Sequence, residues 1–167
     1  MLVCYNKART LLLAMEWRPV ALFLVSAWVA LLDQISKSVV SRLVPMYGSV
    51  VCLGGLVRIT HVRNAGAAFG VFQGRQPMLI AAALAAVGII VVSYPRVSLS
   101  NWPARFGLGL GLGGALGNLI DRLRFGGVVD FVEVGPWPVF NLADTAIVVG
   151  VALILLGMMR SPGRKEE

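Results

Sequence analysis

Four long apolar blocks dominate the chain and are separated by shorter polar segments. They lie at about residues 19–40, 77–94, 103–120 and 140–159. At a rise of about 1.5 Å per residue, each block can cross a hydrocarbon core of about 30 Å as a helix, the second and third only just. Prolines stand in the first turns of three of them, where a missing N–H costs no hydrogen bond. The pattern predicts an all-α polytopic membrane protein with four transmembrane helices, forming a single membrane domain over residues 1–167.

The segment between the first two blocks has a different pattern. Residues 48–53 and 56–63 are rich in β-branched side chains, and Gly54-Gly55 stands between them. This arrangement is typical of two short strands joined by a tight turn. We therefore predict a small β-sheet between helices 1 and 2, within about residues 48–70. His61 is expected in one of its strands, facing water or lipid headgroups.

The third block is unusually rich in glycine. Small residues spaced four apart allow two membrane helices to pack backbone to backbone. The spacing predicts tight packing on two faces of this helix, one with Gly107, Gly111 and Gly114 and the other with Gly109, Gly113 and Gly117.

Composition agrees with a membrane protein. Hydrophobic residues make up 57% of the 167 residues, charged residues only 14%, and the mean hydropathy is +0.80. A soluble domain of this size cannot hide so much apolar surface. The net charge of +7 is scattered along the chain, without the basic runs of a nucleic-acid-binding protein, so no nucleic-acid partner is predicted. Contact with anionic phospholipid explains it more simply.

Lysine and arginine also predict the orientation. Four spans put both termini on one side, with eight basic residues there against six on the other side plus Lys37 at the end of the first span. This bias favours both termini in the cytoplasm. Residues 11–15 are too short for the apolar core of a cleavable signal peptide, so the first span is expected to be retained.

The polar residues inside or beside the apolar blocks converge at one membrane interface. In an up-and-down bundle, the ends of spans one and three and the starts of spans two and four share one side. That side, extracytoplasmic in this orientation, receives Asp33, Lys37, residues 64–70, Asn118, Asp121, Arg122, Asp130, Asn141 and Asp144. Ionisable groups at such depth are costly unless paired or functional.

Two of these carboxylates have no basic neighbour in sequence. Asp121 precedes Arg122 and is expected to form an ion pair with it, and Lys37 lies four residues after Asp33 as its partner. Asp130 and Asp144 can instead share one proton and activate water against an amide. Asp130 as a turn residue and Asp144 as a helix N-terminal acid are the simpler alternatives. The single His61 and the absence of an HExxH motif leave no zinc-protease site, so no metal is predicted.

Five motifs in order resemble the lipoprotein signal peptidases (signal peptidase II). They are Asp33-Gln34-Ile35-Ser36-Lys37, residues 64–70 (NAGAAFG), residues 114–122 (GALGNLIDR), Val128-Val129-Asp130-Phe131 and residues 140–144 (FNLAD). The resemblance covers about residues 20–158.

This resemblance implies a bacterial inner-membrane aspartyl endopeptidase. Such an enzyme cleaves prolipoproteins N-terminal to a cysteine that carries a diacylglyceryl group, needs no cofactor or metal and is inhibited by globomycin. The resemblance implies that Asp130 and Asp144 are catalytic. It places substrate-binding or supporting residues at Asp33, Lys37, Asn64, Gly114, Asn118, Arg122, Asn141 and Ala143, and it gives no role to Glu133 or Trp137.

Two other classes of protein would also place acids in membrane helices. A small proton-coupled transporter uses carboxylates near the bilayer midplane with access from both sides, whereas these acids gather at one interface. A noncatalytic assembly factor would not require both Asp130 and Asp144.

Overall fold

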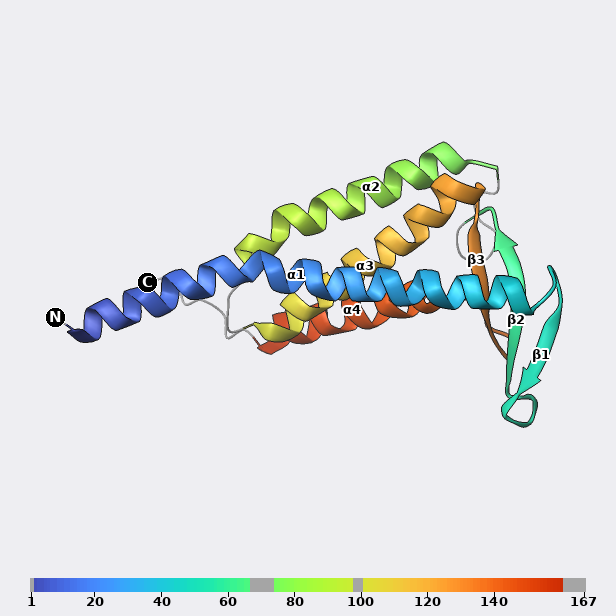
Figure 1. The fold of residues 1–167 in the computed structure, drawn as a ribbon, viewed down its shortest axis with the longest axis horizontal. Helices are drawn as coiled ribbons and strands as arrows, with labels where there is room; N and C mark the ends of the chain where they lie inside the picture. Colours follow the sequence, from blue (N-terminus) through green and yellow to red (C-terminus); the bar gives the residue numbers. More distant parts are fainter. Residues whose placement is uncertain (1, 67–73, 98–100, 161–167) are drawn as a thin grey trace.

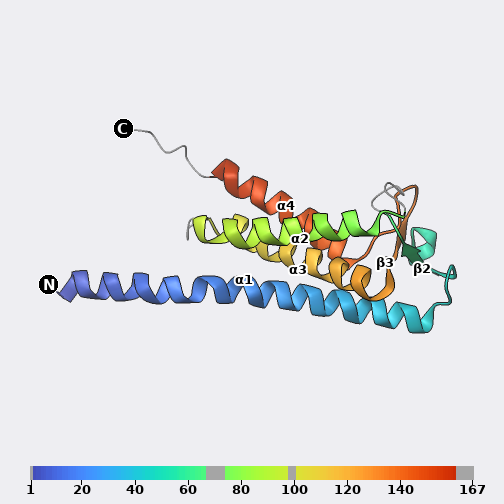
Figure 2. The ribbon, with the colours of Figure 1, turned by 90° about the horizontal axis from the view of Figure 1, so that it is seen from above.

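Four long helices lie side by side in the described part of the chain, and a small sheet closes one end of the bundle (Figure 1). The computed structural model describes residues 2–66, 74–97 and 101–160, with side chains described from residue 20 to residue 159 within these ranges. The helices are α1 (Leu2–Leu43), α2 (Gln76–Ser93), α3 (Trp102–Phe125) and α4 (Leu142–Arg160). We call the end that carries the sheet the sheet end. Seen from above, α1 runs along one side of the other three helices (Figure 2).

Three helical segments are long and apolar enough to cross a membrane. Within the described ranges they are Val20–Leu43, Gln76–Arg96 and Leu142–Met159. Their side chains are mostly exposed, for example Trp28 at 61% and Val148 at 68%, as expected for surfaces whose solvent is lipid. Helix α1 is longer than the predicted first span, because it begins at Leu2.

Helix α3 does not meet the same criterion among the described residues, since six glycines between Gly107 and Gly117 and a polar C-terminal turn lower its hydropathy. It packs against α1, α2 and α4, and most of its residues are buried. Its crossing of the membrane as a fourth span stays a prediction.

The glycines of α3 bring neighbouring helices into backbone contact, as the spacing predicts. A Cβ on Gly113 would lie 2.7 Å from the Ser26 backbone oxygen of α1, and a Cβ on Gly114 would meet the Ala143 backbone oxygen of α4. Gly109 and Gly117 also face α1, whereas Gly107 faces α4. Two different faces of α3 therefore hold α1 and α4 close to it.

The sheet contains three antiparallel strands in the order β1 (Ser49–Cys52), β2 (Val57–Asn64) and β3 (Val128–Val134). The two predicted strands are confirmed, and a short 3-10 turn over Leu53–Gly55 joins them. The sheet predicted between helices 1 and 2 is extended by β3, which comes from the connection between α3 and α4 and was not predicted. Residues 67–70 of the predicted β region lie outside the described residues.

A bulge in β2 turns His61 towards the interior of the protein. Ile59 pairs with Val132 and Val62 pairs with Asp130, so two residues of β2 oppose one residue of β3 between these pairs. The extra residue breaks the alternation of the strand, and both Thr60 and His61 are buried. His61 Nδ1 lies 2.9 Å from the Val44 carbonyl oxygen. The prediction that His61 faces water or headgroups is therefore wrong.

Candidate active site

Strand β3 holds Asp130 at the sheet end, where its side chain is 3% exposed. Its Oδ1 accepts a hydrogen bond from the Asn141 side-chain amide at 2.7 Å, and its Oδ2 accepts one from the Asn64 amide at 3.0 Å. Burial raises the pKa of Asp130 to about 6, and the charge of Asp144 adds to the rise while the two amide donors oppose it. Asp130 is thus a buried carboxyl that titrates near neutral pH.

Asp144 lies in the first turn of α4, within a reciprocal capping arrangement. The Asp144 backbone N–H donates to Asn141 Oδ1 at 2.9 Å, and the Asn141 backbone N–H donates to Asp144 Oδ2 at 3.2 Å. This is the geometry of a capping box, in which the residue before the helix and the third residue within it satisfy each other. Asp144 Oδ1 also accepts from the Asn118 side-chain amide at 2.8 Å. The interpretation of Asp144 as a helix N-terminal acid is confirmed, and one of its oxygens faces a second helix.

Asn141 connects the two aspartates directly. It is fully buried and donates its side-chain amide to Asp130 and its backbone N–H to Asp144. The two carboxylates, 14 positions apart in the sequence, are therefore held by one residue at the junction between the sheet and α4.

A buried lysine supports this arrangement from α1. Lys37 Nζ lies 2.8 Å from Asp33 Oδ2, 3.1 Å from Asp121 Oδ2 and 2.9 Å from Asn118 Oδ1. The predicted pair of Asp33 and Lys37 is confirmed. Asp33 Oδ1 accepts a hydrogen bond from the Ala143 backbone N–H at 3.0 Å, which ties α1 to the first turn of α4.

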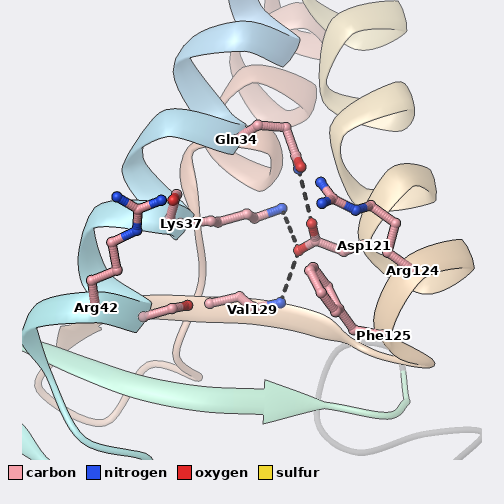
Figure 3. Close-up of a pocket in the computed structure, with 9 residues that line it drawn as sticks. Gln34, Lys37, Arg42, Asp121, Arg124, Phe125 and Val129 are labelled. Carbon is pink, nitrogen blue, oxygen red and sulfur yellow. Dashed lines mark hydrogen bonds and ion pairs between the residues drawn. The ribbon is translucent and has the colours of Figure 1, made fainter.

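The prediction of an ion pair between Asp121 and Arg122 is wrong. Adjacent residues of a helix point in different directions, so the two side chains do not pair. Asp121 pairs with Lys37 and accepts a hydrogen bond from the Val129 backbone N–H at 3.0 Å. It therefore fixes the strand residue that precedes Asp130. Figure 3 shows Lys37, Asp121 and Val129 meeting between α1, α3 and β3.

Sequence reasoning missed two contributors to this site. Gln34 donates to Asp121 Oδ1 at 2.8 Å and to the Gly117 carbonyl oxygen at 3.2 Å, although it stands inside the first motif. The Val129 backbone is the other. Gln34 could have been predicted, because it lies three residues before Lys37 and so on the same face of the helix. The Val129 backbone N–H could not, because a backbone donor does not depend on the residue type.

An open cleft of about 330 Å³ gives access to both aspartates. Asn64, Asn118 and Arg122 also line it, together with apolar residues of α4 such as Ile147 and Val148. Within the described residues, the buried Nε of Arg122 has no hydrogen-bond partner. Five of the predicted residues are outside the cleft lining and pack behind it. They are Asp33, Lys37, Gly114, Asn141 and Ala143. Glu133 pairs with Arg58 at 3.6 Å, and Trp137 lines the cleft.

All ten residues predicted for the site thus gather at the sheet end, in the cleft or directly behind it. Across the described ranges, no group of three His, Cys, Asp or Glu side chains is arranged to hold a metal ion.

The fold and site define a helical membrane protein with one buried and one partly buried aspartate in a cleft at one end of its bundle. The profile of the family described as signal peptidase (SPase) II matches residues 25–160. The lipoprotein signal peptidase of Geobacter sulfurreducens is 43% identical over 141 residues, covering 80% of this chain and 88% of the relative. That of Halothermothrix orenii is 40% identical over 134 residues, covering 80% and 92%.

A solved structure agrees with these relatives. It is described as a bacterial membrane enzyme, and it matches with a TM-score of 0.81 and 27% identity over 88% of this chain and 93% of the other. The chain belongs to the signal peptidase II family, whose members are aspartic peptidases that cleave signal peptides from prolipoproteins. Together with the apolar helices, this indicates a multi-pass protein of the bacterial inner membrane.

Proposed function

We propose that Asp130 and Asp144 are the catalytic pair, and that they hydrolyse the peptide bond N-terminal to a diacylglyceryl-modified cysteine. The observation that carries the proposal is the shared contact of both carboxylates with Asn141 in one open cleft. Two close carboxylates in a poorly hydrated site favour sharing one proton, which supplies one base and one acid.

The raised pKa of Asp130 supports placing the shared proton on Asp130. Ionised Asp144 then takes a proton from water while the water oxygen attacks the peptide carbonyl carbon, and Asp130 donates its proton to the carbonyl oxygen. When the tetrahedral intermediate collapses, Asp144 gives its proton to the leaving nitrogen. The hydroxyl proton returns to Asp130, so both carboxyls regain their starting states.

Arg122 is proposed to bind the substrate beside this pair. Arg122 lines the cleft, and its guanidinium can donate to a backbone carbonyl of the substrate. Asn64 and Asn118 hold the two carboxylates in place through the amide hydrogen bonds described above.

The cleft also suits a substrate that stays anchored in lipid. Its α4 wall contains Ile147 and Val148, and Val148 is 68% exposed on the outer surface of the bundle. A substrate whose acyl chains remain among bilayer phospholipids can therefore present its peptide bond to the aspartates without leaving the membrane. Anchoring also orients the bond for attack. Cyclic peptides of the globomycin type are expected to occupy the same cleft.

We infer the orientation from the distribution of basic residues. The mild bias of eight lysines and arginines against six plus Lys37 supports both termini in the cytoplasm. In that orientation the sheet end and both aspartates face the extracytoplasmic side, where the amino-terminal signal segments of exported lipoproteins end.

The test is cleavage of a diacylglyceryl-modified prolipoprotein by the purified full chain. We expect Asp130→Asn and Asp144→Asn each to abolish cleavage while the circular dichroism spectrum stays unchanged. Glu133→Gln is the matched control, since it removes a carboxylate from the same strand outside the cleft lining, and it should retain activity.

Full activity in either aspartate variant would contradict the catalytic assignment. Equal cleavage of the same precursor without its lipid would contradict the proposed substrate. Proton flux in liposomes without proteolysis would favour a transporter instead.

A further inference from the structure

A second cavity, of about 210 Å³, lies between the C-terminal ends of α1 and α3 (Figure 3). Ser38 and Arg42 line it from α1, and Arg124 and Phe125 line it from α3. None of its lining residues also lines the cleft of Asp130 and Asp144. The proposed peptidase function therefore leaves this cavity unassigned.

The open side of the cavity carries uncompensated positive charge. Arg42 and Arg124 are both exposed, and neither lies within ion-pair distance of a carboxylate in the described residues. Figure 3 shows them on opposite sides of the Lys37–Asp121 pair. The Arg124 guanidinium lies over the Phe125 ring, 5.2 Å from its centroid, which restricts its position.

The inner wall of the cavity cancels only part of that charge. Asp121 is 1% exposed, and its oxygens are already engaged by Gln34, Lys37 and the Val129 backbone. Lys37 offsets one of its two carboxylate partners, so at most one negative charge of this cluster stands against the two arginines. The two arginines therefore dominate the field where the cavity opens, and they favour an anionic ligand.

The position of the cavity indicates where that anion comes from. Arg42 stands one residue before the end of the membrane segment Val20–Leu43, at the depth of lipid headgroups if this segment spans the bilayer. On the same helix, Ile35 and Val39 are about half exposed towards the apolar side of that boundary. A ligand with an anionic headgroup and hydrocarbon chains can bind the arginine with its headgroup and the exposed apolar side chains with its chains.

The size of the cavity and its hydrogen-bond donors narrow the choice of ligand further. The volume lies below the roughly 300–1,000 Å³ of common ligand pockets, so it fits a small anionic group better than a peptide. Guanidinium groups bind phosphate oxygens through paired N–H donors, and the Ser38 hydroxyl adds another donor. Basic pockets between membrane helices are suited to phospholipid headgroups.

We propose that Arg42, Arg124 and Ser38 form a binding site for the phosphate of an anionic phospholipid, whose chains lie along the exposed apolar surface of α1. The site does not depend on the catalytic assignment. It links the lipid to the ends of the two helices that carry Lys37 and Asp121.

The experiment measures binding of short-chain phosphatidylglycerol to the full chain in neutral detergent micelles by native mass spectrometry. Phosphatidylcholine of equal chain length and inorganic phosphate are the comparison ligands. Each arginine is expected to contribute about fivefold, so Arg42→Gln/Arg124→Gln should weaken phosphatidylglycerol binding about twenty-five-fold. The matched control Arg58→Gln/Arg75→Gln removes the same charge from residues outside the cavity and should change binding less than about threefold.

A third variant tests whether binding needs the shape of the cavity as well as its charge. Ser38→Phe fills the cavity without changing the net charge, and it should also weaken phosphatidylglycerol binding. An equal loss in the control pair would overturn the proposal, because it would indicate general attraction to basic protein. Equal binding of phosphatidylcholine, or displacement of the lipid by inorganic phosphate at the same concentration, would overturn it as well.

Discussion

The side-chain oxygen of Asn118 accepts a hydrogen bond from the Lys37 ammonium at 2.9 Å. This contact fixes which end of the Asn118 amide faces α1, because an ammonium can only donate. The NH₂ end therefore points at Asp144, to which it donates at 2.8 Å. A lysine buried in the first membrane helix thus sets the hydrogen bond received by one of the proposed catalytic carboxylates.

Lys37→Met should strongly destabilise the protein. The substitution leaves Asp33 and Asp121 buried without their cation, and breaking a buried ion pair from one side costs about 3–5 kcal/mol. The thermal unfolding midpoint in detergent micelles measures the effect. Arg58→Met, which removes a half-exposed cation from β2, is the control and should shift the midpoint little. A Lys37→Met protein as stable as the unmodified chain would contradict the described cluster.

Gly114→Ala should impair cleavage, whereas Gly111→Ala should not. A Cβ at position 114 would meet the Ala143 backbone oxygen and lie 2.8 Å from Ile147 Cγ1, so α4 has to move away from α3 together with Asp144. At position 111 the nearest atom is Ile90 Cδ1 at 3.7 Å, an ordinary contact. Since glycine costs a helix about 0.5–1 kcal/mol relative to alanine, Gly111→Ala should be neutral or stabilising. Rates and unfolding midpoints of the two variants test this, and equal activity in both would count against close packing at Gly114.

Asp130 should make stability depend on pH. Its folded pKa is raised to about 6 from an ordinary value of 3.8, so the folded protein binds this proton more tightly than the unfolded chain does. Its contribution to stability is therefore fully present below about pH 4 and is lost as the pH rises through 6. Asp130→Asn cannot ionise, so its unfolding midpoint relative to the unmodified chain should rise between pH 4.5 and pH 7.5. The same difference for Glu133→Gln serves as the control, and a flat Asp130→Asn difference across this range would refute the raised pKa.

Asn64→Ala should slow cleavage and shift its pH dependence. Asn64 donates to Asp130 Oδ2, and losing a donor to a carboxylate disfavours the ionised form and raises its pKa further. We expect kcat to fall about tenfold or more and the apparent pKa in the pH profile of kcat to move upwards. Arg63→Ala, at the neighbouring position of β2 over the Phe125 ring, is the control. An unshifted pH profile would show that Asn64 does not act through Asp130.

Much of the candidate site can be predicted from the sequence, because bilayer energetics make buried polar residues conspicuous. Asp33, Lys37, Asn118, Asp130, Asn141 and Asp144 stand out against apolar surroundings, and an up-and-down bundle sends them to one end whichever way it is oriented. Glycine spacing likewise predicted two closely packed faces on α3, although not the helices that they approach. These inferences depend on local period and chain direction, both of which can be read from a single sequence.

Other features required the tertiary structure. The third strand forms only because the connection between α3 and α4 lies against β2, and pairing between distant segments leaves a weak local pattern. The bulge that buries His61 also depends on that pairing. The partner of Asp121 depended on the distance between α1 and α3, so the adjacent Arg122 was a misleading guide.

Hydrophobicity, periodicity and residue order were enough to predict the apolar helices, the end of the bundle that holds the acids and the family motifs. Which side chains meet depends on how the helices and strands pack. Asn141 joins Asp130 to Asp144, and Lys37 orients Asn118, because hydrogen bonds act over about 3 Å. That precision arises from the packing of α1, α3, α4 and β3 together, and no single segment contains it.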